Sequence, residues 1–308
     1  MPSQKELSDL REAYLLKREA MLQKNVSGLS VKLYDKIFEQ YLIGLEQSNG
    51  KLVYNKKNLN LIQGLDKVYA SFNKTDNLPV VNGFFGDLNG ITPLNTAYFK
   101  NIAKTGLRAE SEVVSAVVQN KLGLKNGKPV ANGFADKFIN DKTLLKTIKK
   151  QTTQAITKGQ SFQVFREQLK TTIQGTEGSV NSGGLQQYYR NYAYDTYQKV
   201  DRLNQDLFAK ELGMRYFIWA GGLVANSRPL CVLCNGKVVD KTWFAGLQYK
   251  DLKTSDDKKH DLRLGLDETW NPMNDLGQYA CRHTKNYILD SVARQLSGKW
   301  LKKEQLVG

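Results

Sequence analysis

The segment Gly213-Met-Arg-Tyr-Phe-Ile-Trp219 marks the point where the chain changes from helical periodicity to short strands. Upstream of it, apolar residues recur every three or four positions, which is typical of amphipathic helices. Downstream, residues 215–219 and 236–240 are rich in aromatic and β-branched side chains and predict a β-pair. The pair flanks the sequence Cys231-Val-Leu-Cys234. We therefore predict a mainly α protein with a small α+β C-terminal lobe.

The beginning of the chain is predicted to be a series of helices. Ser3 and Glu6 have the spacing of a capping box, in which each side chain accepts a bond from the other residue's backbone N–H. The first helix should end at residues 25–28, and a second should run from residue 29 to a turn at residues 48–50. A third helix is expected around residues 61–72, where apolar residues again follow helical spacing.

Residues 73–93 are predicted to be irregular, because they contain two Asn-Gly pairs and two prolines. A second loop, rich in Gly, Asn and Lys, is expected at residues 123–133. Further helices are expected before and after this second loop, at residues 94–104, 107–122, 144–156 and 161–169.

A long helix is predicted from Leu185 to Leu212, after a flexible link at residues 176–184. Its tyrosines fall on several faces, which favours packing within protein, although tyrosines with interleaved arginines can also stack on bases. Residues 141–170 hold seven Lys/Arg against two acids, and a solvated helix face is the favoured interpretation over a specific DNA surface. The candidate DNA contacts in these segments are Lys146, Lys149, Lys150, Tyr188, Tyr189 and Arg190.

The predicted elements divide the chain into three consecutive regions. Residues 1–135 form a helical N-terminal region, and residues 136–213 form a helical region that ends in the long helix. Residues 214–308 form the α+β lobe, which carries the cysteines. Within the lobe, a charged, loop-like stretch precedes a last helix expected from about residue 284 to residue 296.

The composition is that of a folded protein with a basic surface. Of its 308 residues, 41% are hydrophobic, and the formal net charge is +15. The charge favours a polyanionic partner or an acidic protein assembly, and the basic residues are scattered rather than gathered in a tail. No apolar run approaches the roughly 18–20 residues that a membrane helix needs, and the N-terminus lacks an apolar signal-peptide core. We expect folding in a reducing cytosol, where clustered cysteines are more often thiols or metal ligands than disulfides.

Cys231, Cys234, Cys281 and His283 are the candidate metal ligands. Together they can supply a closed Cys3His site for structural zinc, because a Cys-x2-Cys turn and a Cys-x-His pair can each contribute two ligands. Three alternatives stay open. Cys231 or Cys234 could pair with Cys281 in a disulfide, all three cysteines could be buried thiols, or His283 could only bond a backbone carbonyl.

Catalysis has little support in the residues, and we predict no catalytic residue. A cysteine nucleophile needs a histidine base, and the chain has only His260 and His283. No phosphate-cradling Gly-x4-Gly-Lys-Ser/Thr loop is present, and no Gly-x-Gly-x2-Gly follows a predicted strand.

The order of several segments resembles the C-terminal module of phage Mu F-like minor head proteins, the phage head morphogenesis family. The segments are Gly213 to Trp219, Ser227-Arg-Pro-Leu-Cys231, Asn235-Gly-Lys237, Trp270-Asn-Pro272, and Gly277 to Cys281-Arg-His283. The resemblance covers about residues 140–295. It implies a low-copy structural protein of a tailed-phage head, assembled in the host cytoplasm and incorporated beside the portal. The implied partners are the portal, other head proteins and double-stranded DNA, and the implied location is the virion.

The resemblance also implies which residues hold the C-terminal lobe together. They are Trp219, Arg228, Gly236, Lys237, Trp270 and Arg282, with the cysteines and His283. We expect Arg228 and Arg282 to bridge loops to backbone carbonyls or acids. Many family members have one cysteine in the first segment, so Cys234 departs from the pattern and favours a metal here.

Some of the candidate DNA contacts have a second role under the resemblance. The long helix with its tyrosines, the N-terminal helices and the basic residues Lys146, Lys149 and Lys150 are candidates for contact with the portal or its neighbours.

Two other functions are kept as alternatives. The first alternative is a dedicated DNA-binding protein ejected with the genome, whose affinity for duplex DNA would depend steeply on salt. The second is a nuclease that uses a metal-bound water, which would need three protein ligands instead of four.

Overall fold

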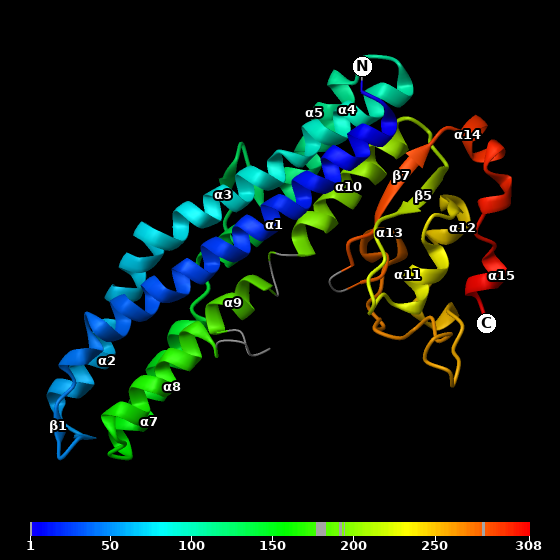
Figure 1. Cartoon of the computed structure of the whole chain (residues 1–308). Coiled ribbons are helices and arrows are strands. Elements are labelled where there is room, and N and C mark those ends of the chain that lie inside the picture. Colours follow the sequence, from blue (N-terminus) through cyan, green and yellow to red (C-terminus); the bar gives the residue numbers. More distant parts are fainter. Residues whose placement is uncertain (1, 177–182, 191–192, 194, 279–280) are drawn as a thin grey trace. The chain divides into compact units, whose positions relative to one another are not determined.

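The computed structural model describes residues 2–176, 183–190, 193, 195–278 and 281–308. The protein is mainly α-helical, with a long N-terminal helix and a small C-terminal sheet (Figure 1). The predicted fold class is therefore confirmed. Within the described residues, none of the helices is both long enough and apolar enough to cross a membrane.

The chain divides into two compact units, neither of which is one continuous stretch. Unit 1 contains Met1–Lys17, Leu88–Lys121 and Tyr194–Gly308, and unit 2 contains Arg18–Asp87 and Leu122–Ala193. Our sequence division was into three consecutive regions instead, and the first of them contributes to both units.

Unit 1 is built on helices that precede the sheet. They are the first part of α1 (Gln4–Tyr34), α4 (Ile91–Ala103), α5 (Arg108–Lys121) and α10 (Asp195–Glu211). The predicted capping box begins α1, since Ser3 N donates to Glu6 and Glu6 N donates to the Ser3 hydroxyl. Helix α10 packs against α4 and α5, where the rings of Phe99 and Phe208 stack at 5.2 Å.

The sheet of unit 1 has three antiparallel strands in the order β6-β5-β7. They are β5 (Tyr216–Ala220), β6 (Val238–Asp240) and β7 (Thr284–Ile288). The predicted β-pair is confirmed, with Phe217 opposite Val239 on one side and Tyr287 on the other. Strand β7 lies between β5 and α10 (Figure 1).

Short helices and turns fill the remainder of unit 1. They are α11 (Pro229–Cys234), α12 (Lys241–Phe244), α13 (Pro272–Asp275), α14 (Asp290–Gln295) and α15 (Lys303–Leu306). The opposite face of the sheet from Phe217 is covered by α14, through a cluster of Tyr216, Val238, Ile288 and Ala293. The predicted charged stretch before β7 is indeed mostly turns and loops.

The prediction of one helix over residues 284–296 was wrong. Residues 284–288 form β7, and only α14 is helical, starting at Asp290. Leu289, one of the apolar residues that suggested a helix here, is 45% exposed. The apolar spacing fitted a helix, but Tyr287 and its neighbours gain a complete ladder of partners on β5, and tertiary pairing of this kind overrides local periodicity.

Unit 2 contains the second part of α1 and several shorter helices. They are α2 (Lys56–Phe72), α3 (Leu78–Asn89), α6 (Phe134–Ile139), α7 (Thr143–Thr157), α8 (Phe162–Gln174) and α9 (Gly184–Tyr189). Two small hairpins, β1 (Gln47–Ser48) with β2 (Lys51–Leu52) and β3 (Leu124–Lys125) with β4 (Lys128–Pro129), occupy two of the predicted turns. Helix α7 packs between α2 and α8.

Two predicted breaks in unit 2 are helical. Helix α1 continues through residues 25–28, because Val26 and Leu29 extend one buried face. Residues 73–93 form a π-helical turn η3 (Asn73–Asn77), α3 and the start of α4. In α3 the buried residues Val81, Phe84 and Leu88 follow helical spacing, and their burial outweighs the cost of about 1 kcal/mol for a glycine inside a helix.

The predicted long helix from Leu185 to Leu212 is described in two parts, α9 and α10. Residues 191, 192 and 194, where the two parts would join, lie outside the described residues. Most of the predicted link, residues 177–182, lies outside them as well.

Candidate metal centre

The connection between β5 and β6 places Cys231 in the interior of unit 1. Pro229 occupies the first turn of α11, where its fixed φ suits a helix start. After α11 the chain returns to β5: Gly236 N donates to the Trp219 carbonyl at 2.8 Å, and Trp219 N donates to the Lys237 carbonyl at 3.0 Å. Gly236 has φ +72°, a left-handed conformation that favours glycine. Trp219, Gly236 and Lys237 therefore fix the position of α11 on the sheet.

Cys231, Cys281 and His283 come together just before β7. Their ligand atoms all lie within 4.8 Å of one another, and each residue is at most 5% exposed. The Cys281 sulfur lies 3.6 Å from His283 Nδ1. The other ring nitrogen, His283 Nε2, is buried and has no hydrogen-bond partner among the described residues. Residues separated by 50 positions in the sequence thus form one buried cluster of two sulfurs and an imidazole.

Gly277 allows the two sulfurs to approach each other. A Cβ at this position would lie 2.3 Å from the Cys231 sulfur, closer than atoms can pack, and 3.0 Å from the Cys281 sulfur, which is tighter than ordinary van der Waals contact. The Gly277 N–H points at the Cys281 sulfur, 3.3 Å away. The preceding turn is held by Trp270, whose indole N–H donates to the Leu276 carbonyl at 2.5 Å. The Gly277 loop is therefore shaped around the cluster.

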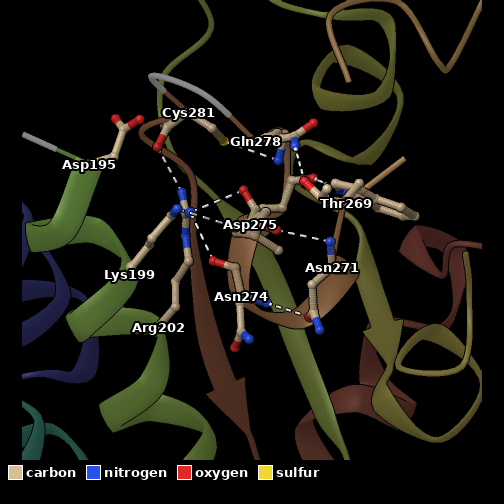
Figure 2. Close-up of polar contacts among 12 residues, drawn as sticks. Asp195, Lys199, Arg202, Thr269, Asn271, Asn274, Asp275, Gln278 and Cys281 are labelled. Atoms are coloured by element: carbon tan, nitrogen blue, oxygen red, sulfur yellow. Dashed lines mark hydrogen bonds and ion pairs between the residues drawn. The ribbon is translucent and has the colours of Figure 1, made fainter. Parts of the chain in front are cut away.

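A buried arginine on α10 holds both ends of this loop. Arg202 is 2% exposed and donates hydrogen bonds only to backbone carbonyls. On one side it bonds the carbonyls of Asn274 and Asp275, and on the other those of Cys281 and His283 (Figure 2). A planar guanidinium can bond several acceptors in fixed directions, so Arg202 sets where Cys281 and His283 lie just before β7.

A hydrogen bond between the two clustered sulfurs shifts their pKa values in opposite directions. The hydrogen bond from Cys231 lowers the pKa of Cys281, and His283 and Arg202 lower it further against the opposing effect of burial. The same hydrogen bond, together with burial, raises the pKa of Cys231. Metals bind cysteine as thiolate, so binding of a metal would release thiol protons.

The cluster fits a borderline-soft metal such as zinc. Thiolate sulfur and imidazole nitrogen are the ligands that zinc takes in tetrahedral sites. A Zn–S bond of about 2.3 Å and a Zn–N bond of about 2.0–2.1 Å place a tetrahedral sulfur and nitrogen roughly 3.6 Å apart, and the separation of Cys281 Sγ from His283 Nδ1 is 3.6 Å. The residues present are therefore close enough to hold an ion without a large rearrangement.

Cys234, the fourth expected ligand, is not part of this cluster. It ends α11, is fully buried, and has a pKa raised by that burial alone. None of the three cysteines is in a disulfide. Cys234 therefore corresponds to the buried-thiol alternative, because an apolar surrounding keeps a thiol protonated and inert.

Arg228 and Arg282 are the two arginines that we expected to bridge loops to carbonyls or acids, and each makes one contact of this kind. Arg228 Nε donates to the Gly265 carbonyl at 3.0 Å. Arg282 pairs with the carboxylate of Asp195 at 3.3 Å. The first contact joins the segment before α11 to the loop at Gly265. The second contact joins the segment just before β7 to the start of α10.

The candidate DNA or portal contacts in unit 2 are placed differently from one another. Tyr189 is fully buried and meets the ring of Phe138 edge-on, while Tyr188 stacks on the same ring at 5.1 Å. These tyrosines pack within the unit, so Tyr189 has no surface to offer a partner. The remaining candidates are Lys146, Lys150 and Arg190, which are exposed, and Lys149, which pairs with Asp66.

Sequence reasoning missed Arg202 because polar positions on a helix are usually assigned to solvent. In α10 the polar residues Gln198, Asp201, Arg202 and Gln205 are all buried. Asp201 accepts from Asn95, Gln205 and Thr284, so a polar network replaces the expected apolar stripe. The available signal was this repeat of polar residues at helical spacing directly before the sheet.

Comparisons with protein-family models, with curated proteins and with solved structures find no match to this chain. Two of the segments that carry the resemblance described above, residues 227–231 and 277–283, supply Cys231, Cys281 and His283.

Proposed function

We propose that this chain is a non-enzymatic minor head protein of a tailed phage, which acts in head morphogenesis beside the portal. One observation carries the proposal. Two segments far apart in sequence, which belong to the set whose order and spacing resemble the Mu F-like module, supply the buried Cys231–Cys281–His283 cluster. The rings of Trp219 and His283 lie 6.1 Å apart, so the tryptophan of the first segment contacts the last.

The cluster has a structural role in this proposal. Residues 252–278 contain little regular structure, and Arg202 holds the later part of this stretch through the carbonyls of Asn274 and Asp275. A metal bound by Cys231, Cys281 and His283 would join this loop to α11 and β7. Structural metals stabilise folded units in this way because the free energy of metal binding becomes free energy of folding.

The charge supports a location within a DNA-filled shell. The net charge is +15, and exposed lysines such as Lys146 and Lys150 lie on α7. Scattered exposed cations bind phosphates without sequence preference, and such binding weakens steeply as salt rises. We propose contact with packaged DNA as an accompaniment to the structural role.

The test is the composition and yield of heads from the phage that encodes this chain. We expect mass spectrometry to find the protein in procapsids and virions at a few copies per head, and deletion of its gene to leave few infective heads. A Cys281→Ser variant should be incorporated poorly, while Cys234→Ser should behave like the parent protein. Absence of the chain from both procapsids and virions would contradict the proposal.

A metal-dependent nuclease is the second candidate, and one observation favours it. The cluster supplies three ligands rather than four, and three protein ligands plus a water are typical of catalytic zinc sites. If this candidate holds, the zinc-loaded protein should cleave plasmid DNA, and Cys281→Ser should abolish cleavage while the protein stays folded. A zinc-loaded, folded protein that leaves plasmid DNA intact would exclude it.

A further inference from the structure

A cavity of about 860 Å³ in unit 1 opens beside the metal-ligand cluster. Cys231, Cys281 and His283 form part of its wall, and the rest comes from the segment between β5 and α11 and from the charged loop. Exposed apolar side chains lie at the cavity, namely Val224, Val232 and Leu264. The cavity is much larger than one water molecule and admits a ligand of several atoms beside the cluster.

The charged residues that line the cavity have one sign. They are Arg228, Lys258, Lys259 and Arg282, and none of the described lining residues is acidic. Asp195 neutralises part of the charge of Arg282, and Arg228 Nε donates to the Gly265 carbonyl. Lys258 and Lys259 are exposed. The cavity is thus electropositive, which favours an anion as its ligand.

The ligand cluster itself is incomplete for a tetrahedral metal. Cys231, Cys281 and His283 supply three donors, and Cys234 is outside the cluster. A zinc ion with two thiolates and a neutral imidazole carries no net charge, so it does not repel an anionic fourth ligand. The donor that completes the tetrahedron must enter from a side that the protein leaves open, and the cavity provides such a side.

We infer that this cavity binds a phosphate group, one oxygen of which becomes the fourth ligand of the metal held by Cys231, Cys281 and His283. The inference rests on the metal centre of the proposed function. The bound group is either free phosphate or a phosphate within a nucleic-acid backbone. Phosphate matches the basic lining because Arg and Lys are the side chains that bind phosphate oxygens most strongly. The metal and the basic residues would then hold one ligand between them.

The test uses the full chain loaded with Co²⁺ in place of zinc. Cobalt bound by thiolates has strong visible absorption that depends on all four ligands, so it reports replacement of the fourth one. We expect inorganic phosphate to change this spectrum saturably. If the site binds a phosphate within a nucleic-acid backbone, a short oligonucleotide should cause the same spectral change. If the site binds free phosphate, inorganic phosphate should cause the change and the oligonucleotide should not.

Two sets of variants sharpen the test. The double variant Lys258→Gln/Lys259→Gln should weaken phosphate binding roughly three- to tenfold while leaving the metal content unchanged. The matched control Lys125→Gln/Lys128→Gln removes the same charge from an exposed hairpin of unit 2 and should bind phosphate like the parent. Cys234→Ser should leave the cobalt spectrum unchanged.

Three outcomes would overturn the inference. A cobalt spectrum that responds to neither phosphate nor oligonucleotide means that water alone completes the site. A spectrum altered by Cys234→Ser means that the protein itself supplies the fourth ligand. A chain that binds no metal at all removes the metal centre of the proposed function too, and metal analysis distinguishes that case from the other two.

Discussion

At the scale of single residues, the cluster depends on a position that has no side chain. Gly277 lies where a Cβ would collide with the sulfurs of Cys231 and Cys281. We predict that Gly277→Ala separates the sulfurs and weakens metal binding by about 10- to 100-fold, the usual effect of disturbing residues that orient metal ligands. Competition with a chromophoric chelator measures the affinity. Gly298→Ala is the control, because nothing lies within 4 Å of a Cβ there. Equal affinities for the two variants would contradict the role of Gly277.

Arg202 is the second residue on which the cluster depends. Its guanidinium bonds the carbonyls of Asn274, Asp275, Cys281 and His283. We predict that Arg202→Met lowers the free energy of unfolding by about 3 kcal/mol, because buried carbonyls lose their donors. Urea denaturation monitored by tryptophan fluorescence measures this. The exposed Arg294 provides the control Arg294→Met, in which the free energy of unfolding should change little. Similar losses in both variants would show that the bonds of Arg202 to these carbonyls do not stabilise the fold.

The sequence identified four candidate ligands, but it did not show which three of them form the cluster. Cys231, Cys281 and His283 stood out because so few cysteines and histidines occur in the chain. Spacing alone could not separate Cys231 from Cys234, since both lie in one turn of α11 and only the packing of that helix decides which sulfur meets Cys281. Arg202 carried no sequence signal of its own, because its partners are backbone carbonyls.

At the scale of elements, a carboxylate joins two π-helical turns of unit 2. Asp76 of η3 accepts from Lys36 of η1 (Asp35–Glu39) at 2.7 Å and from Thr75. These bonds, that from Lys36 foremost, hold the pKa of Asp76 below its ordinary value of 3.8. The folded state therefore binds this proton less tightly than the unfolded state. The resulting stability is present above the ordinary pKa and is lost as pH falls through the lowered one.

We predict that Asp76→Asn destabilises the protein by about 0.5 kcal/mol near neutral pH, the size typical of a solvent-screened pair. The difference from the parent should shrink when the pH is lowered to about 3, where the carboxyl group is increasingly protonated. Urea midpoints at the two pH values measure it. The exposed Asp9 supplies the control variant Asp9→Asn. A difference that is constant with pH would contradict the assigned pKa shift.

Elements were predictable where local pattern and tertiary packing agree. The β5–β6 pair and helices α2, α5, α7 and α8 followed from apolar spacing and from glycines that end helices. Prediction failed at residues 73–93, where Asn-Gly pairs signal turns but Val81, Phe84 and Leu88 are buried on a helix. It failed again at β7, because the partner strand that fixes residues 284–288 lies about 70 positions upstream.

At the scale of the whole molecule, a basic, mainly helical protein contains one buried cluster of candidate metal ligands, which we call the centre. The two units draw on separate stretches of the chain, and the centre lies entirely within unit 1. The proposed role in a phage head, the nuclease alternative and the phosphate inference all depend on whether that centre holds a metal. The metal centre is therefore the central claim.

The most direct test is the metal content and thiol reactivity of the full chain purified without chelator. We predict about one zinc per chain, as one Cys2His cluster would hold. The zinc should be lost in Cys231→Ser and in Cys281→Ser and kept in Cys234→Ser. The Cys231 and Cys281 thiols should react only after denaturation in chelator. A chain with no metal and with freely reactive thiols at Cys231 and Cys281 would contradict the account.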